Sequence, residues 1–239
     1  MSIENTTASA VDSDTKGLYR AGGISAIVLG ICYVVIIGVY VVGGAPPNEA
    51  EQWLKYLSRH TTAWWTILGL SVLTDLLFVP VVISLYVALK NVNRNAMLAG
   101  AGLVVAFVVL DLAVTWPNYS SLITLSGKYA AATNDAQRTA FVAAAQYASA
   151  VLTSTVVGVY AILVPSLGNL IIGIVMRKGT FSKVTAYLAV ISGILGIVSV
   201  VGPHFVTALG LAIVIGSALT TVWVVLVGYR LYRLGETAS

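Results

Sequence analysis

Two aspartates stand in apolar surroundings, where a charged side chain is costly. Asp75 lies in VLTDLLFVP, and Asp111 lies in VVLDLAVTWPNY. Neither of the apolar segments that carry them contains a lysine or an arginine to balance the charge. An unpartnered carboxylate inside a bilayer costs on the order of 3 kcal/mol or more, so such residues are functional candidates by default.

A pair of buried carboxyl groups could do three kinds of chemistry. They could hold a proton, and at least one is then protonated at neutral pH, because two ionised carboxylates in a medium of low dielectric constant repel strongly. They could bind a cation, or they could line a wet cavity open to the outside. The structural alternative is a neutral aspartic acid that is hydrogen-bonded to Thr74, Thr115 or a backbone carbonyl.

The composition places these residues in an integral membrane protein. Of 239 residues, 58% are hydrophobic and only 9% are charged, against roughly a quarter charged in a soluble domain. The basic residues are scattered over short loops, which argues against nucleic acid as a partner. The single cysteine, Cys32, allows no disulfide or thiolate metal site within one chain.

Six segments are long and apolar enough to span a bilayer, which takes about 20 residues each. The predicted fold is therefore all-α, a six-helix membrane domain over residues 17–234 between a disordered cytoplasmic tail, 1–16, and a second tail, 235–239. The predicted spans are Tyr19–Val42, Thr62–Leu89, Ala96–Trp116, Ala150–Met176, Val184–Val201 and Phe205–Leu231.

The basic residues also predict the orientation. If the N-terminus is cytoplasmic, nine Lys and Arg residues fall on the inner side and four on the outer side. Cytoplasmic loops carry the excess of positive charge, so both termini are expected inside. The predicted location is the cell membrane, crossed several times.

The outer side is predicted to carry a small cap, built from residues 43–61 and 117–139. PPNEAEQWLKYLSRH predicts a short interfacial helix, and Asn134 begins a helix that runs directly into the fourth span. Several Trp and Tyr residues gather here. An aromatic belt at the membrane surface is the favoured interpretation, and a ligand cage is the alternative.

The aspartates are predicted to share a depth. With the second and third spans as a hairpin turning near Val92, both lie some 25 to 29 Å from the turn, at about 1.5 Å per residue. We therefore expect them on facing surfaces in the outer half of the bilayer.

Further polar groups are expected at the same level and complete the candidate ligand- or proton-binding site. They are Tyr160 and Thr155 of the fourth span, Trp116 at the end of the third, and His204 at the outer turn before the sixth. Two histidines and two aspartates could in principle hold zinc or copper, but they lack local ligand spacing, so no metal site is predicted.

No enzyme signature is present: HExxH, GxSxG and glycine-rich phosphate loops are all absent. An enzyme is therefore the least favoured class, and no cofactor is identified. The first functional class is a protein that binds or transports a proton, a cation or a small ligand through an outer-half cavity. The alternative is a structural or accessory subunit that packs against other membrane proteins or a second copy.

Three stretches carry a family resemblance: YRAGGISAIVLGI, PVVISLYVALKNVNRNAMLAG and GNLIIGIVMRKGTFSKVTAYLAVISGILGIV. With them the chain resembles a large prokaryotic family of six-helix membrane proteins known only as a domain of unknown function. The resemblance implies a six-helix bundle. It implies no activity and no site residues.

Overall fold

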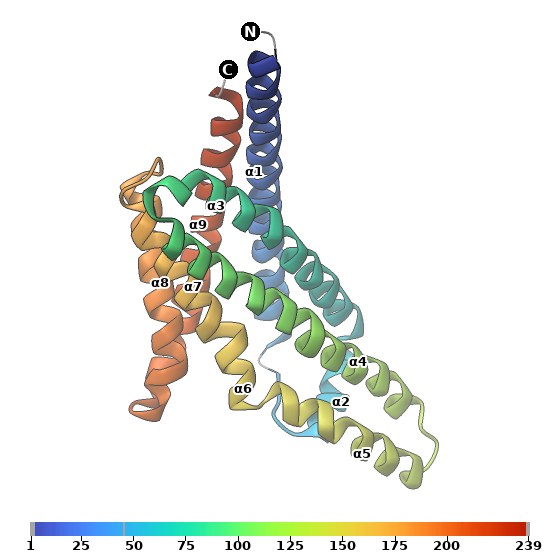
Figure 1. Ribbon diagram of the computed structural model, residues 1–239. Coiled ribbons are helices and arrows are strands. Elements are labelled where there is room, and N and C mark those ends of the chain that lie inside the picture. Colours follow the sequence, from blue (N-terminus) through green and yellow to red (C-terminus); the bar gives the residue numbers. More distant parts are fainter. Residues whose placement is uncertain (1–2, 45, 238–239) are drawn as a thin grey trace.

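The computed structural model describes residues 3–44 and 46–237, and over these residues the regular structure is all helical (Figure 1). The α-helices are α1 (Ile3–Gly43), α2 (Ala50–Arg59), α3 (Thr61–Leu110), α4 (Trp116–Ala131), α5 (Asp135–Leu152), α6 (Thr155–Gly158), α7 (Val164–Met176), α8 (Lys183–Val201) and α9 (Ala212–Thr237). Two π-helices, η1 (Asp111–Thr115) and η2 (Val159–Leu163), and two 3-10 helices, η3 (Gly202–His204) and η4 (Thr207–Leu211), join them.

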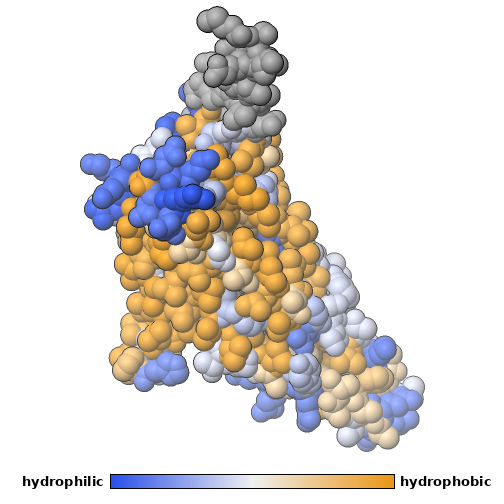
Figure 2. Space-filling model, in the orientation of Figure 1, coloured by the Kyte–Doolittle hydropathy of each residue, from blue (hydrophilic) through white to orange (hydrophobic). Residues whose placement is uncertain are grey.

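Within the described residues, five helical segments are long and apolar enough to cross a membrane. They are Thr15–Gly43, Thr61–Ala131, Asp135–Met176, Lys183–His204 and Thr207–Glu236. Such helices fit the membrane bundle that the composition predicts. Figure 2 shows a broad hydrophobic surface over their middle, with hydrophilic groups towards both ends.

The longest segment reverses its direction at Asn93, where the backbone leaves the helical region (φ −159°, ψ 96°). The Asn93 side chain accepts a hydrogen bond from the Ala96 amide at 3.0 Å and so caps the helix that follows. The two legs of α3, residues 61–92 and 94–110, form the hairpin that the sequence predicts near Val92 (Figure 1).

Six helical legs form a ring. In order around it, α1 packs on the first leg of α3, the second leg packs on α7, α7 on α8, α8 on α9, and α9 on α1. Glycine permits the closest approaches: a Cβ at Gly23 would meet the Tyr232 amide of α9 at 2.6 Å, and one at Gly193 would meet the Ser166 carbonyl of α7 at 2.7 Å. The small residues of the first span therefore serve packing within the chain.

The cap is a second, separate core. α2 packs on α4 and α5, and its exposed Glu51 accepts a hydrogen bond from the Tyr129 hydroxyl of α4 at 3.0 Å. Lys55, 2.7 Å away, and Tyr129 together hold the pKa of the Glu51 carboxyl below its usual value.

Inside the cap, Trp53 and Trp64 are almost completely buried. The prediction of an aromatic belt is wrong for these two residues, because their rings pack on one another and on Tyr119.

The entry to the fourth membrane segment also differs from the prediction. Asn134 caps α5 as expected, accepting from the Gln137 amide at 2.9 Å. The helix does not continue unbroken, because the chain turns at Thr153 and Ser154 before α6 begins. Both side chains donate to carbonyls of α5, which supplies local partners where the helix ends.

The predicted boundaries of the tails correspond to no break in the helices. α1 already begins at Ile3 and α9 continues to Thr237, while the outermost residues of both tails lie outside the described residues. The free ends of α1 and α9 lie at the same end of the bundle (Figure 1).

Candidate functional site

The structure brings Asp75 and Asp111 together inside the bundle. Their side chains are 2% and 5% exposed, and Asp111 lies near enough to influence the Asp75 carboxyl electrostatically. Asp75 belongs to the first leg of α3, whereas Asp111 opens η1 at the end of the second leg. The hairpin therefore places the two carboxyl groups at one level, as their distances from the turn predict.

Asp75 has a partner at the start of α4. The indole Nε1 of Trp116 donates a hydrogen bond of 2.6 Å to Asp75 Oδ2. Thr74, a partner considered from the sequence, instead donates to the Ser71 carbonyl of its own helix.

Asp111 is less completely satisfied. Thr115, one turn further along, interacts with its carboxyl group, but the Oδ1 atom is buried without a hydrogen-bond partner. The Thr115 hydroxyl also lies 2.8 Å from the Tyr160 hydroxyl. If Thr115 donates to Asp111, then Tyr160 donates to Thr115, because each hydroxyl has a single hydrogen.

Two π-helices create this arrangement, and each is followed two residues later by a proline, Pro117 or Pro165. A proline ring clashes with the carbonyl of the residue four positions earlier in an α-helix. The wider turn of a π-helix relieves that clash. It also changes which residues share a face, since residues five apart lie about 140° apart around an α-helix but are hydrogen-bonded neighbours in a π-helix.

The π-turn therefore returns Trp116 to the face of Asp111. The Trp116 amide donates to the Asp111 carbonyl, and its side chain reaches across to Asp75. The second π-turn holds Tyr160, 6% exposed, against Thr115. π-Helical turns are frequent at functional sites in proteins.

Aromatic rings enclose the carboxyl groups on two sides. Phe78 lies three residues after Asp75, and Phe107 lies four residues before Asp111, so both rings sit one turn along the same helix faces. Their centroids are 6.1 Å apart in an edge-to-face arrangement. Tyr33 of α1 lies against Phe78, in the neighbourhood of both aspartates. On the cap side, Trp116 stacks on Tyr119.

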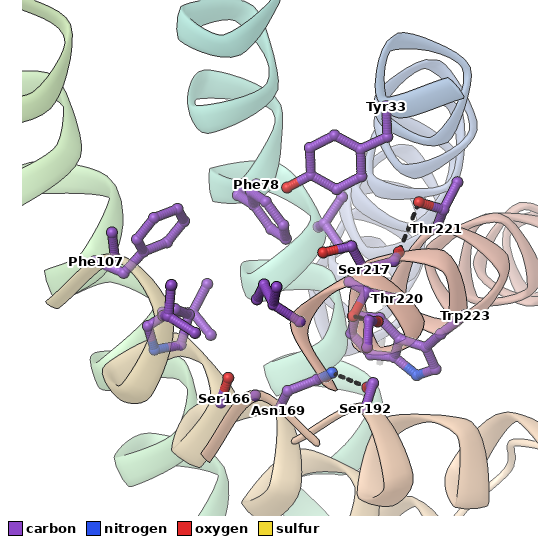
Figure 3. A pocket seen from close by; sticks show the side chains of 18 of the residues that line it. Tyr33, Phe78, Phe107, Ser166, Asn169, Ser192, Ser217, Thr220, Thr221 and Trp223 are labelled. Carbon is purple, nitrogen blue, oxygen red and sulfur yellow. Dashed lines mark hydrogen bonds between the residues drawn. The ribbon is translucent and has the colours of Figure 1, made fainter. Parts of the chain in front are cut away.

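A central cavity of about 380 Å³ adjoins this cluster (Figure 3). It shares Tyr33, Phe78 and Phe107 with the aspartate surroundings, but the carboxyl groups themselves do not line it. Across from these rings, Asn169 donates a hydrogen bond of 2.8 Å to the Ser192 hydroxyl.

Two predicted site residues are not part of the cluster. Thr155 is exposed at the start of α6, and His204 is exposed in η3, beyond the end of α8. Neither acts on the carboxyl groups, whose partners among the described residues are Trp116, Thr115 and each other. Over the same residues, no group of three His, Cys, Asp or Glu side chains could hold a metal ion.

Residues that sequence reasoning missed include Phe78 and Phe107, although their helical spacing from the aspartates could have indicated them. Tyr33 gave no such signal, because it comes from another helix.

Comparison with known proteins adds one match: a family model described as Domain of unknown function (DUF4386) covers residues 21–228. The chain belongs to the DUF4386 family. No curated protein and no solved structure matched it. The family membership agrees with the predicted resemblance and assigns no activity to the aspartate cluster.

Proposed function

We propose that this DUF4386 chain crosses the cell membrane six times, with both termini in the cytoplasm, and that Asp75 and Asp111 bind one shared proton in proton-linked binding or transport. The observation that carries the proposal is the pair itself. Two buried carboxyl groups lie near enough for an electrostatic interaction, and no Lys or Arg among the described residues forms an ion pair with either. One negative charge is easier to bury than two, so one shared proton is the minimal neutralisation.

A proton suits the partners better than a metal cation does. The Trp116 N–H is a donor, and it already occupies one oxygen of Asp75. A cation would need several oxygen ligands in its first shell, whereas the groups around the pair are indole, phenol and phenyl rings with a few hydroxyls. The Tyr160 and Thr115 hydroxyls form a short hydrogen-bonded connection that ends at Asp111, suited to pass a proton.

The ring of helices and the charge distribution support this topology. Six legs agree with an even number of crossings, and the free ends of α1 and α9 lie at one end of the bundle, opposite the cap. The short loops with basic residues, near Val92 and Thr180, are then cytoplasmic.

A cysteine placed at either position should react with an impermeant reagent only after the cells are opened. Labelling from outside intact cells would reject the orientation.

An accessory role has less support. Small residues allow helices to pack closely, but those of the first span pack inside the chain, with Gly23 against α9 and Gly22 against Ser84 of α3. Gly102 of the second leg has open space around it, but a single small residue on a lipid-facing surface does not define a partner.

The proton can be observed directly by infrared spectroscopy of the purified protein in lipid. The wild type should show the carbonyl band of a protonated, buried carboxylic acid at neutral pH, and the Asp75→Asn/Asp111→Asn double variant should lack it. Asp135→Asn, at a fully exposed carboxylate, is the matched control and should keep the band. A wild type without the band, or a double variant that keeps it, contradicts the proposal.

A further inference from the structure

We propose that the central cavity is a second binding site, for an uncharged amphipathic small molecule that enters from the lipid phase. This inference is independent of the aspartate pair. The cavity lies at the centre of the ring, and all six legs contribute to its lining. Its volume of about 380 Å³ falls within the range of small-molecule sites, about 300–1,000 Å³.

The lining divides into an apolar side and a polar side. α1 and α3 contribute aromatic and aliphatic side chains, among them Phe78, Phe107 and Leu85. α7, α8 and α9 contribute an amide and several hydroxyls. The labelled members of this polar side are Ser166, Asn169, Ser192, Ser217, Thr220 and Thr221 (Figure 3). A molecule with an apolar body and a small polar head matches this division.

The Asn169 amide presents an acceptor without a donor. Its Nδ2 group donates to Ser192 Oγ, and Ser192 in turn uses its only hydrogen on the Ala189 carbonyl. Ser192 can therefore only accept from Asn169, which fixes the orientation of the amide. The remaining Oδ1 atom is buried with no hydrogen-bond partner. Because Oδ1 has almost no accessible surface, a ligand hydroxyl or N–H would pair with it only after a small rotation of the Asn169 side chain.

Trp223 provides the complementary group. Its side chain lines the cavity and is 4% exposed, yet the indole Nε1 is buried without an acceptor. Buried polar groups are normally paired, so an unpaired one indicates a missing partner. A head group that both donates and accepts, such as a hydroxyl, could pair with either atom once a small shift of the side chain exposes that atom to the cavity.

The ligand should carry no net charge. Among the described residues that line the cavity there is no Asp, Glu, Lys, Arg or His, and an ion without a counter-charge in an apolar site is strongly disfavoured. The aspartates are excluded from the lining, with the Phe78 and Phe107 rings one turn away from them.

The cavity reaches the surface between α1 and α9. These helices are in tight contact at Gly23 and Gly30, whereas further along, the lining residues Ile37 and Ser217 are exposed. A Cβ at Gly38, next to Ile37, would meet nothing within 4 Å. The opening thus lies in the apolar surface of the bundle, which favours a ligand dissolved in lipid over one dissolved in water.

Photolabelling in lipid vesicles tests this inference. The probe is a fatty alcohol with a photoreactive diazirine on its chain, and mass spectrometry of peptides locates the labelled residues. Labelling should map to the cavity lining. Asn169→Leu and Trp223→Phe should each weaken it about fivefold, the equivalent of one hydrogen bond. Asn118→Leu, at an asparagine of α4 outside the cavity, should leave it unchanged.

Two further probes of the same chain length separate the explanations. An alkane or a carboxylate carrying the diazirine should label the lining less than the alcohol does. Equal labelling by the alkane, or labelling insensitive to both variants, would overturn the inference, because an acyl chain would then be filling a gap without polar recognition. The Asp75→Asn/Asp111→Asn variant should still bind the alcohol, so this result and the infrared result can fail separately.

Discussion

The aspartate cluster and the central cavity lie one helical turn apart and satisfy polar groups in different ways. In the cavity, the Thr220 and Thr221 hydroxyls donate at 2.9 Å to carbonyls of their own helix, four residues earlier. In the cluster, Trp116 reaches Asp75 across the hairpin, and Tyr160 reaches Thr115 from another helix. A back-bonded hydroxyl needs only its own helix, whereas the cluster requires that three helical segments keep their positions. The cavity lining also has a hydrogen bond between two helices, from Asn169 to Ser192, but the cluster depends on the relative positions of more segments.

The largest effect should come from separating the helices around the cavity. Gly193→Ala places a Cβ 2.7 Å from the Ser166 carbonyl and 2.9 Å from the Leu170 amide, so α7 and α8 must move apart. We expect a loss of unfolding free energy on the order of 3 kcal/mol, as for other overpacked sites. The measurement is reversible denaturation in mixed micelles. Gly102→Ala, at a glycine with open space, should be neutral or slightly stabilising, and equal losses would show that the ring is loosely packed.

A smaller effect is expected from removing one donor in the cluster. Trp116→Phe deletes the N–H that Asp75 accepts, while a ring remains to stack on Tyr119. Leaving a buried carboxyl without its donor should cost about 2 kcal/mol, measured in the same way. Trp65→Phe, at a tryptophan 44% exposed, should change stability little. A variant at Trp116 as stable as wild type would mean that Asp75 finds another donor.

The smallest effects should separate the two kinds of hydroxyl. Thr115→Val removes a hydroxyl that bridges two helices and should cost about 1 kcal/mol. Thr221→Val removes a buried hydroxyl bonded only to its own helix and should cost less than about 0.5 kcal/mol. Unfolding of the two variants side by side is the check. If Thr221→Val is the more harmful, the proposed difference between the two regions is wrong.

The sequence predicted the features that depend on local pattern. The hairpin near Val92 and the shared depth of the aspartates follow from the lengths of the apolar segments. The N-terminal capping of α5 by Asn134 follows from a short polar side chain just before a helix. Family membership agrees with the apolar stretches that carry the resemblance.

Features that depend on several helices could not be predicted in the same way. The burial of Trp53 and Trp64 requires α2, α3 and α4 to meet, and no single segment encodes it. The π-turns did leave a trace in Pro117 and Pro165, but Pro80 lies inside α3 with no π-turn. A proline alone therefore does not decide whether a helix widens. At η1 and η2 the wider turn accompanies hydrogen bonds between segments, made by Trp116 and Tyr160.

The hydrogen bond between Trp116 and Asp75 gives the protein an optical property. An indole absorbs and emits ultraviolet light, and its spectrum shifts with the electric field along the ring. Because the donor is joined directly to the carboxylate, any change in the charge of the pair alters the field at this chromophore. The site thus contains its own reporter, and subtracting the spectrum of a Trp116→Phe variant from that of the wild type isolates its signal from those of the other four tryptophans.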